Sequence, residues 1–470
     1  MHFCVLLCVV LFFHLGGSSI VYDIQGDLQR GFFSLNMGVG KSGNGTVPFS
    51  FPLLLDVSSS ATMIPDVLCK DCAGEKKYDA KLSQSHAAVE CTSDFCLAGK
   101  EDVCPNSHSP SGQCCDSHSQ GLCMWDSALQ FNTRFPASGG IIRDSIQMGD
   151  YTVDTYLVDV FESSSLPGQL EGILGLGEAS CNPTCMPPIY QSILAAEHGS
   201  YKKEDMRFSV CFGRTAGKLY FDAYDPHVAS SPAVVSYQRK DEIGYTFDLL
   251  DLRLNNQSFT GLTALGLNRV ALLESAFSEI KLPRDLYDKL VAQLKADFAA
   301  AEGVADGSVF EGQGVATLEG YPTFDVKIPG ALLHLPPQLY FVKKEGRFFL
   351  QIVANDFENT VQLGLAAMRG FVTEFQYEKV SFASVNPSVC GDDVDGAVGT
   401  VEWAEERERI NIWNPVTLIA ILSCVLMIAL LVYLIRSNSG KKALPVGNTN
   451  LPTAIDPFNE QQQSLVPASA

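Results

Sequence analysis

Two stretches of the chain repeat one pattern around an acidic residue. The first is LLLDVSSSATMIP, residues 53–65, and the second is ALLESAFSEIKLP, residues 271–283. In each, an apolar run ends at the acid, a turn follows, and a proline stands nine residues after the acid. Asp56 and Glu274 therefore occupy matching strand-and-turn units. The repeat predicts a duplicated fold in which the two acidic turns meet at a seam with two-fold symmetry.

The repeat extends beyond the acids. Downstream of Asp56 comes EGILGLG, residues 171–177, and downstream of Glu274 comes VQLGLAAMRGFVTEFQ, residues 361–376. Each contains an apolar strand that ends at a glycine, at positions 175 and 364. A duplicated lobe explains this order, because each copy would supply one acid loop and one such strand.

The rest of the pattern is mainly one of strands. A chain of 470 residues with 46% hydrophobic residues is long enough for two lobes. Residues 151–161 and 217–225 alternate or are rich in β-branched and aromatic residues, as strands are. Helices are predicted over 187–199 and 283–303, the second with an apolar stripe. The fold class is therefore mostly β, with a few peripheral helices.

The two ends of the chain predict a type I membrane protein. Residues 1–19 contain a short apolar block followed by small residues, which is typical of a cleaved signal peptide. Residues 416–435 carry no charge and are long enough to cross a bilayer as a helix. Basic residues follow at once, so the tail 436–470 is expected in the cytoplasm and the bulk of the chain in the lumen or outside the cell.

Cysteine usage agrees with this topology. Outside the signal and the span the cysteines number twelve, and eight of them crowd into residues 69–123. Zinc is the alternative for CKDC, residues 69–72, but the irregular spacings and the lack of a suitable histidine pair favour disulfides on the oxidising side. We expect no metal and no cofactor. The predicted disulfide cysteines are Cys69, Cys72, Cys91, Cys96, Cys104, Cys114, Cys115, Cys123, Cys181, Cys185, Cys211 and Cys390, and their pairing within the insert stays open.

Charge and short motifs add three expectations. The net charge of −20 is spread over the bulk of the chain, which argues against a nucleic-acid partner. Sequons at Asn44 and Asn256 permit glycosylation where they are exposed. Residues 391–415 lose the strand pattern and are predicted to form a stalk, with a membrane-proximal helix over 401–413.

Six segments in order give the chain a resemblance to the pepsin family of aspartic peptidases. They are GFFSLNMGVG, LLLDVSSSATMIPDVLCKDC, GGIIRDSIQMG, EGILGLG, RFSVCFG and LGLAAMRGFVTEFQYEKVSFASV. The resemblance covers about residues 31–390. Within the family, the chain resembles the cysteine-rich nepenthesin-like and membrane-anchored branches. The resemblance implies a bilobal fold. The first lobe is expected at residues 31–205 and carries the cysteine-rich insert. The second is expected at residues 206–390 and is closed by a disulfide between Cys211 and Cys390.

The resemblance also implies a chemistry for the two acids. In an aspartic peptidase, two carboxyls lie too close together for both to ionise, and they hold one water molecule between them. One carboxyl activates this water as a base, and the other serves as the acid. The residue after each acid supplies a hydroxyl that ties the loops together. The next is a glycine, and the one after it gives the carboxylate a hydroxyl partner. Asp56 and Glu274 stand at the two catalytic positions.

Both loops depart from this pattern. The first keeps Ser59, but Val57 replaces the tying hydroxyl and Ser58 replaces the glycine. In the second, Glu274 adds one methylene to the acid, about 1.5 Å of reach. Misplacement by about 1 Å can cost a hundredfold in rate. Of the other second-loop residues, Ser275 fits, whereas Ala276 replaces glycine and Phe277 a small hydroxyl residue.

The cleft beyond the acids is altered as well. By spacing, the flap tyrosine of the family falls on Phe131, and the tryptophan after the first loop falls on Met63. The alternative for both residues is a place in the apolar core.

Three functional hypotheses follow. We favour a membrane-anchored homologue that binds peptide or protein in its cleft and hydrolyses little or nothing. The alternative is an active endopeptidase of an acidic secretory or endosomal compartment, using Asp56 and Glu274. The third is an unrelated β ectodomain in which both acids are solvated turn residues.

Overall fold

The computed structural model describes the chain over a defined set of residues. These are 19–28, 30–69, 71–72, 74–94, 96, 113–116, 121–126, 137–163, 170–177, 187–199, 207–239, 244–260, 269–297, 308–355, 359–391 and 398–404. The chain divides into two compact units, residues 1–406 and 407–470. The second unit lies wholly outside the described residues, so every structural statement below concerns the first.

Several predictions from the sequence fall outside the described residues. They are the signal before residue 19, the span 416–435, the tail 436–470, Phe131, Cys104, Cys181 and Cys185. Within the part that is described, no helix is long and apolar enough to cross a membrane. The membrane anchor therefore stays a prediction.

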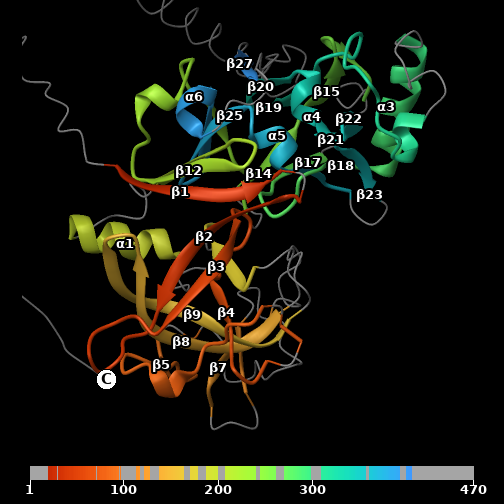
Figure 1. Ribbon diagram of the computed structural model, residues 1–470. Helices are drawn as coiled ribbons and strands as arrows, with labels where there is room; N and C mark the ends of the chain where they lie inside the picture. Colours follow the sequence, from red (N-terminus) through yellow and green to blue (C-terminus); the bar gives the residue numbers. More distant parts are fainter. Residues whose placement is uncertain are drawn as a thin grey trace, which may run out of the picture. The chain divides into compact units, whose positions relative to one another are not determined.

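The described chain is mostly β, as the strand patterns predict (Figure 1). The strands up to residue 175 are β1 (Ile20–Asp27), β2 (Phe32–Val39), β3 (Phe49–Asp56), β4 (Met63–Pro65), β5 (Ala87–Ala88), β6 (Gln113–Cys115), β7 (Cys123–Asp126), β8 (Ala137–Met148), β9 (Tyr151–Ser163) and β10 (Gly172–Gly175). Those after it are β11 (Arg207–Phe212), β12 (Ala216–Phe221), β13 (Val234–Tyr237), β14 (Thr246–Leu249), β15 (Asp251–Leu254), β16 (Gln257–Ser258), β17 (Arg269–Leu273), β18 (Ile280–Pro283), β19 (Phe324–Ile328), β20 (Gly330–Leu335), β21 (Phe341–Lys344), β22 (Arg347–Leu350), β23 (Ile352–Asn355), β24 (Val361–Leu363), β25 (Phe371–Gln376), β26 (Lys379–Ser384) and β27 (Thr400–Ala404).

Helices are few and short. The α-helices are α1 (Ile189–His198), α3 (Arg284–Asp297), α4 (Pro337–Tyr340), α5 (Leu365–Met368) and α6 (Pro387–Cys390), and the 3₁₀ turns are η1 (Ala80–Leu82), η4 (Pro226–Val228) and η5 (Ser308–Glu311). Both helices expected from the sequence are present as α1 and α3. In α3 the stripe Leu286, Leu290 and Leu294 is buried, as an amphipathic helix requires.

One large sheet joins strands from both halves of the chain. Its order within the described residues is β13-β26-β25-β11-β12-β1-β2-β3-β10-β4-β9-β8-β7-β6, with β5 on β8. Strand β1 pairs antiparallel with β12 on one side and with β2 on the other. Strand β1 lies before residue 31, where the first lobe was predicted to begin.

The repeat in the sequence is a repeat of strand pairing. Strand β10 pairs parallel with β3, which carries the first acid, and antiparallel with β4. Strand β24 pairs parallel with β17, which precedes the second acid, and antiparallel with β18. The outer neighbours match too, because β4 pairs parallel with β9 and β18 pairs parallel with β23. The duplicated topology thus sets both acids at the ends of equivalent strands.

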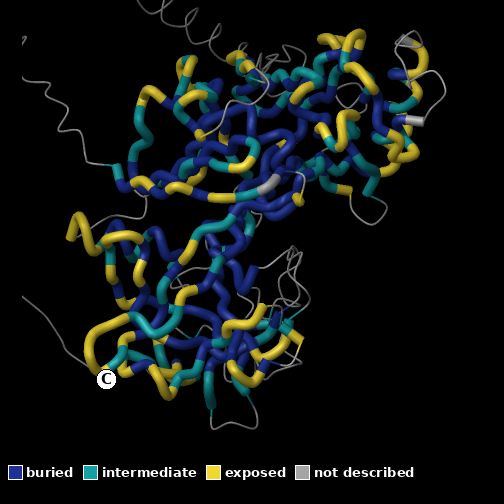
Figure 2. The backbone as a smooth tube through the Cα atoms, viewed as in Figure 1, coloured by how far each residue is buried: buried dark blue, intermediate teal, exposed yellow. Residues whose placement is uncertain are grey.

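The core follows these strands through both halves. Buried residues, dark blue in Figure 2, make up the last four positions of β3 and the last three of β17. The side chains of Phe208 and Phe375 stack with ring centroids 4.7 Å apart, on neighbouring strands of the large sheet. Stacking of this kind adds to the apolar area that each ring buries.

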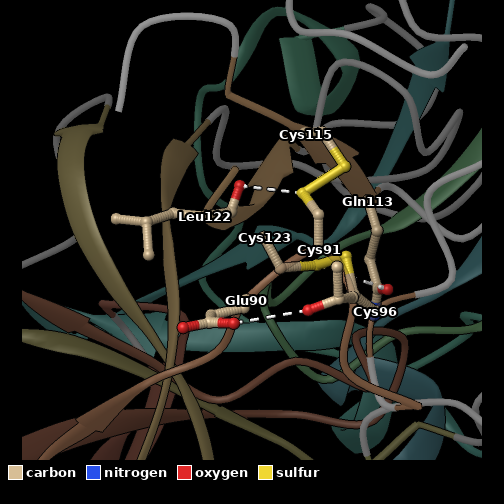
Figure 3. Close-up of a disulfide and its surroundings, with 8 residues drawn as sticks. Glu90, Cys91, Cys96, Gln113, Cys115, Leu122 and Cys123 are labelled. Carbon is tan, nitrogen blue, oxygen red and sulfur yellow. Dashed lines mark hydrogen bonds between the residues drawn. A yellow bond between two sulfur atoms is a disulfide. The ribbon is translucent and has the colours of Figure 1, made fainter. Parts of the chain in front are cut away.

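Disulfides brace the edge of the first half. Cys69 pairs with Cys72, Cys91 with Cys115 and Cys96 with Cys123. Figure 3 shows the last two bonds side by side, where β6 and β7 pair, with the Cys91 sulfur 3.2 Å from the Leu122 carbonyl oxygen. The sulfurs of Cys91, Cys96 and Cys115 lie within 4.8 Å of one another, but as disulfides they are not metal ligands. In the second half Cys211 pairs with Cys390, the bond that the resemblance implied.

The segment expected to be a stalk begins inside the fold. Residues 400–404 form β27, which pairs antiparallel with β20 from Gly330↔Ala404 to His334↔Thr400. The prediction of a helix from residue 401 is wrong over this stretch, because residues 401–404 belong to strand β27. A sheet edge offered unpaired N–H and C=O groups, and satisfying these outweighed a weak local helix preference.

Candidate active site

The first acid loop holds the Asp56 carboxylate by one oxygen. Asp56 ends β3, and its Oδ1 accepts hydrogen bonds from the Ser58 N–H at 2.8 Å, the Ser58 hydroxyl at 2.8 Å and the Ser59 N–H at 3.2 Å. The Ser59 hydroxyl instead donates to the Ala61 carbonyl at 3.3 Å. Ser58, read in the sequence as a lost glycine, therefore provides the hydroxyl partner that the pattern of the family led us to expect from Ser59.

The second acid loop holds the Glu274 carboxyl more loosely. The Ala276 N–H donates to Glu274 Oε1 at 3.3 Å. Phe277, at the position of a small hydroxyl residue in the family, is buried, and the Lys281 ammonium lies 3.9 Å from its ring centroid. The aromatic ring fills space in this loop but offers the carboxyl no hydrogen bond.

One hydroxyl ties the two loops together. The Ser275 hydroxyl accepts a hydrogen bond from the Val57 N–H at 3.0 Å and donates one to the Leu55 carbonyl at 2.8 Å. These bonds join residues more than two hundred positions apart. Val57 is fully buried and has no hydroxyl, so it returns no such tie to the second loop.

The structure brings the two predicted acids together. Asp56 and Glu274 are 6% and 3% exposed, and they lie close enough for the charge of Asp56 to act on the Glu274 carboxyl. Burial raises the pKa of Glu274 well above its usual value, and the nearby charge of Asp56 raises it further. Hydrogen bonds from the Ser58 side chain and the Ala276 N–H oppose this rise. The Glu274 carboxyl therefore keeps its proton to a higher pH than an ordinary glutamate does.

Two glycines let a strand pass directly behind each acid loop. A Cβ on Gly175 would lie 2.4 Å from the Ala61 carbonyl oxygen, and one on Gly364 would lie 2.2 Å from the Glu279 carbonyl oxygen. Real Cβ atoms do not approach so closely. The glycine at the end of each apolar strand is thus required by close approach of the backbone.

Of the two predicted cleft residues, the structure describes one. Met63 opens β4, is 2% exposed and packs in a core cluster with Ile173 and Val158, so its alternative as a core residue fits. Three surface cavities, of about 530, 480 and 410 Å³, are lined by residues outside both acid loops.

A second carboxyl pair lies outside the acid loops and has no counterpart in the sequence analysis. Asp66 and Asp159 are 6% and 4% exposed. Burial raises the pKa of Asp159 to about 9, helped by a hydrogen bond and the charge of Asp66. The two residues are 93 positions apart and no spacing rule joins them. The pairing of β4 with β9 brings them together.

Comparison with known families agrees with this architecture. The family described as eukaryotic aspartyl protease matches residues 117–385, more than half of the chain. No curated protein matches the chain closely enough to be reported. The match begins after the first acid loop, and the structure supplies that loop as a strand-for-strand copy of the second. The chain belongs to the eukaryotic aspartyl protease family.

Proposed function

We propose that the protein is a pepsin-type homologue that binds extended peptide or protein segments between its two acid loops and hydrolyses them weakly or not at all. The fold suits peptide binding, because the family to which the chain belongs acts on peptides. The two acids are buried, and the charge of Asp56 acts on the Glu274 carboxyl, as in a pair of acids that hydrolyses peptides. Their support, however, is unequal.

The unequal support of the two acids carries this proposal. Three hydrogen bonds of 2.8 to 3.2 Å hold one Asp56 oxygen, whereas the Ala276 N–H reaches Glu274 at 3.3 Å. General acid and base catalysis depends on hydrogen-bond geometry before pKa. A longer acid with weaker support, tied by one crossing hydroxyl instead of two, is poorly placed to share a water with its partner.

An active endopeptidase is the second candidate. It is favoured by the raised pKa of Glu274 beside Asp56, since acid–base pairs work when neighbouring carboxyls titrate apart. In that case Glu274 would serve as the acid and Asp56 as the base.

Peptide cleavage separates the two candidates. The purified full-length protein and its Asp56→Ala variant are incubated with a mixed peptide library from acid to neutral pH, and products are read by mass spectrometry. We expect the two to give the same background. Cleavage that disappears in the variant would establish the active endopeptidase.

A single reversion tests whether the support is what limits hydrolysis. Glu274→Asp restores the usual acid but leaves Val57, Ala276 and Phe277 in place. We therefore expect cleavage to stay near background in this variant. Strong cleavage would show that the length of the acid alone was limiting.

Cellular placement is part of the same proposal. We propose entry into the secretory pathway through residues 1–19 and a type I anchor at 416–435. The four disulfide bonds described above suit an oxidising compartment. Asn44 and Asn256 both lie on exposed turns, which suits glycosylation.

A further inference from the structure

The surface cavity of about 480 Å³ has a lining rich in cations. It lies where the turn after β1, the turn between β11 and β12, the hairpin of β21 and β22 and the end of α5 meet (Figure 1). Its basic residues are Arg214, Lys343 and Arg369, and its acidic residue is Glu319. The cavity is therefore basic, although the chain as a whole carries a net charge of −20.

Arg369 is the most deeply placed of these cations. It follows α5 and is 6% exposed. Its Nη2 donates a hydrogen bond to the Phe341 carbonyl oxygen at 3.2 Å, and Phe341 lines the same cavity. This bond fixes the guanidinium at the cavity wall. A guanidinium is planar and matches the two oxygens of a carboxylate.

The other two cations lie on separate elements. The carbonyl oxygen of Arg214 accepts a hydrogen bond from the Leu28 N–H at 3.1 Å, which joins the turn between β11 and β12 to the residue after β1. Lys343 stands opposite Phe348 where β21 pairs with β22, and its ammonium lies 5.4 Å from the Phe348 ring centroid. The fold thus brings three positive charges to one cavity from distant parts of the chain.

The remaining wall of the cavity is largely apolar. Leu28, Phe341 and Val342 are buried, Phe348 is half-buried, and all four line the cavity. Small-molecule sites have this character, with apolar walls, a few charged or polar groups and volumes of about 300–1,000 Å³. An inorganic anion would contact the cations and leave the apolar wall in water. A ligand that has both a negative head and an apolar body would use both parts of the lining.

We propose that this cavity binds a small carboxylate with an apolar body. Arg369, Arg214 and Lys343 hold the carboxylate, and the apolar body packs against Leu28 and Phe341. The inference goes beyond the proposed function, because it uses no residue of either acid loop. Two sources share this ligand chemistry, a free carboxylic acid and the carboxyl end of a short peptide.

Matched acids and amides test the inference. The ligands are octanoate with octanamide, and N-acetyl-leucyl-leucine with its carboxamide, so that each pair differs in charge and keeps its apolar body. Dissociation constants for the full-length protein are measured by ligand-observed NMR titration at neutral pH. At least one acid should bind about tenfold more tightly than its amide, since hydrogen bonds to a charged group are about twice as strong as neutral ones.

The pair that shows the preference identifies the source of the ligand. A preference for octanoate indicates a free acid, and one for the dipeptide indicates a peptide end. Equal binding of acid and amide in both pairs would overturn the inference. Inorganic phosphate should bind at least about tenfold more weakly than the preferred acid, because it gains nothing from the apolar wall. Phosphate binding as tight as that of the acid would also contradict it.

Two neighbouring lysines give a matched pair of variants. Lys343 and Lys344 follow each other in β21, where successive side chains point to opposite faces, and Lys343 lines the cavity whereas Lys344 does not. Lys343→Gln should weaken binding of the acid by about threefold, as the loss of an exposed ion pair does, and leave the amide unchanged. Lys344→Gln makes the same change in net charge and should leave both unchanged.

Arg214→Gln should likewise weaken the acid alone. Denaturant unfolding checks that each variant keeps the wild-type midpoint. An acid that binds between the two acid loops instead would respond to neither Lys343→Gln nor Arg214→Gln, and that result would overturn the inference. So would equal weakening by Lys343→Gln and Lys344→Gln, because it would mean that the overall charge of the protein attracts the ligand.

Discussion

At the scale of single residues, Ser275 shows how much of the fold depends on one hydroxyl. It satisfies the Val57 N–H and the Leu55 carbonyl, both deep in the seam between the acid loops. A buried backbone group left without a partner costs about 1–3 kcal/mol. Val57 has no hydroxyl that could form the equivalent hydrogen bond from the first loop to the second, so the loops depend more on Ser275.

Ser275→Ala removes both hydrogen bonds and adds no bulk. We expect it to lower the free energy of unfolding by about 2–4 kcal/mol, because two buried backbone groups lose their partner. Denaturant unfolding of the full-length protein measures this. Ser275→Thr keeps a hydroxyl and should stay close to the wild type. A loss below about 1 kcal/mol in Ser275→Ala would mean that the crossing bonds are dispensable.

Residue-level prediction from the sequence succeeded where the repeat fixed the position. The pattern around the two acids predicted that Asp56 and Glu274 meet, and the structure brings them together. It did not predict that Ser58 rather than Ser59 bonds the carboxylate, because a side-chain direction depends on the backbone of the turn. Nor did it find Asp66 beside Asp159, since that contact comes from strand pairing alone.

At the scale of elements, the two apolar strands that end in glycine are the most constrained parts of the fold. Each lies between an acid-bearing strand and the strand after the loop. Their glycines contact backbone, which has no flexible end to move aside. The glycine therefore belongs to the geometry of the loop as much as the acid does.

Gly364→Ala tests that constraint. A Cβ would meet the Glu279 and Phe277 carbonyl oxygens at 2.2 and 2.8 Å, so we expect a loss of about 2 kcal/mol or more in the free energy of unfolding. Gly140→Ala, in β8, is the matched control. Its Cβ would lie 3.4 Å from the Phe161 ring, an ordinary contact, and stability should change by less than about 1 kcal/mol. Equal effects of the two substitutions would refute the close-approach argument.

The sequence predicted the long elements and missed those defined by distant partners. Strand β9 and helix α3 carry clear periodicities, and both lie where expected. Strands β1 and β27 were missed because each pairs with a strand far away in the chain, β1 with β12 and β27 with β20. Local pattern does not reveal which edge of a sheet is open.

At the scale of the whole molecule, burial and hydrogen bonding raise the pKa of four ionisable groups. Burial raises the pKa of Glu274, Asp159 and Glu374, and a hydrogen bond that the His334 ring donates to Asp325 raises the pKa of His334. In each case the folded state binds its proton more tightly than the unfolded state. Stability from these groups is therefore present at low pH and lost as pH rises through the folded pKa values.

Asp159→Asn tests this pH dependence at the Asp159 carboxyl. The ordinary pKa of Asp159 is 3.8 and its folded pKa is about 9. Between these two values, each unit of rising pH should lower the free energy of unfolding by about 1.4 kcal/mol. The amide cannot ionise, so the variant should have a flatter curve of unfolding free energy against pH. Asp154→Asn, exposed on the same strand, is the control and should leave the slope unchanged. A slope unaffected by Asp159→Asn would show that the carboxyl is not protonated in the folded protein.

The position of strand β1 has a consequence for proteolysis near the amino terminus. Among the described strands of the large sheet it lies between β12 and β2, so residues 20–27 pair with a strand from each half of the chain. Trimming by a protease at this strand would uncover two long hydrogen-bonding edges at once. Exposed edges recruit strands from other molecules. Overdigestion at the amino terminus should therefore appear first as self-association, before any loss of the disulfide-braced regions.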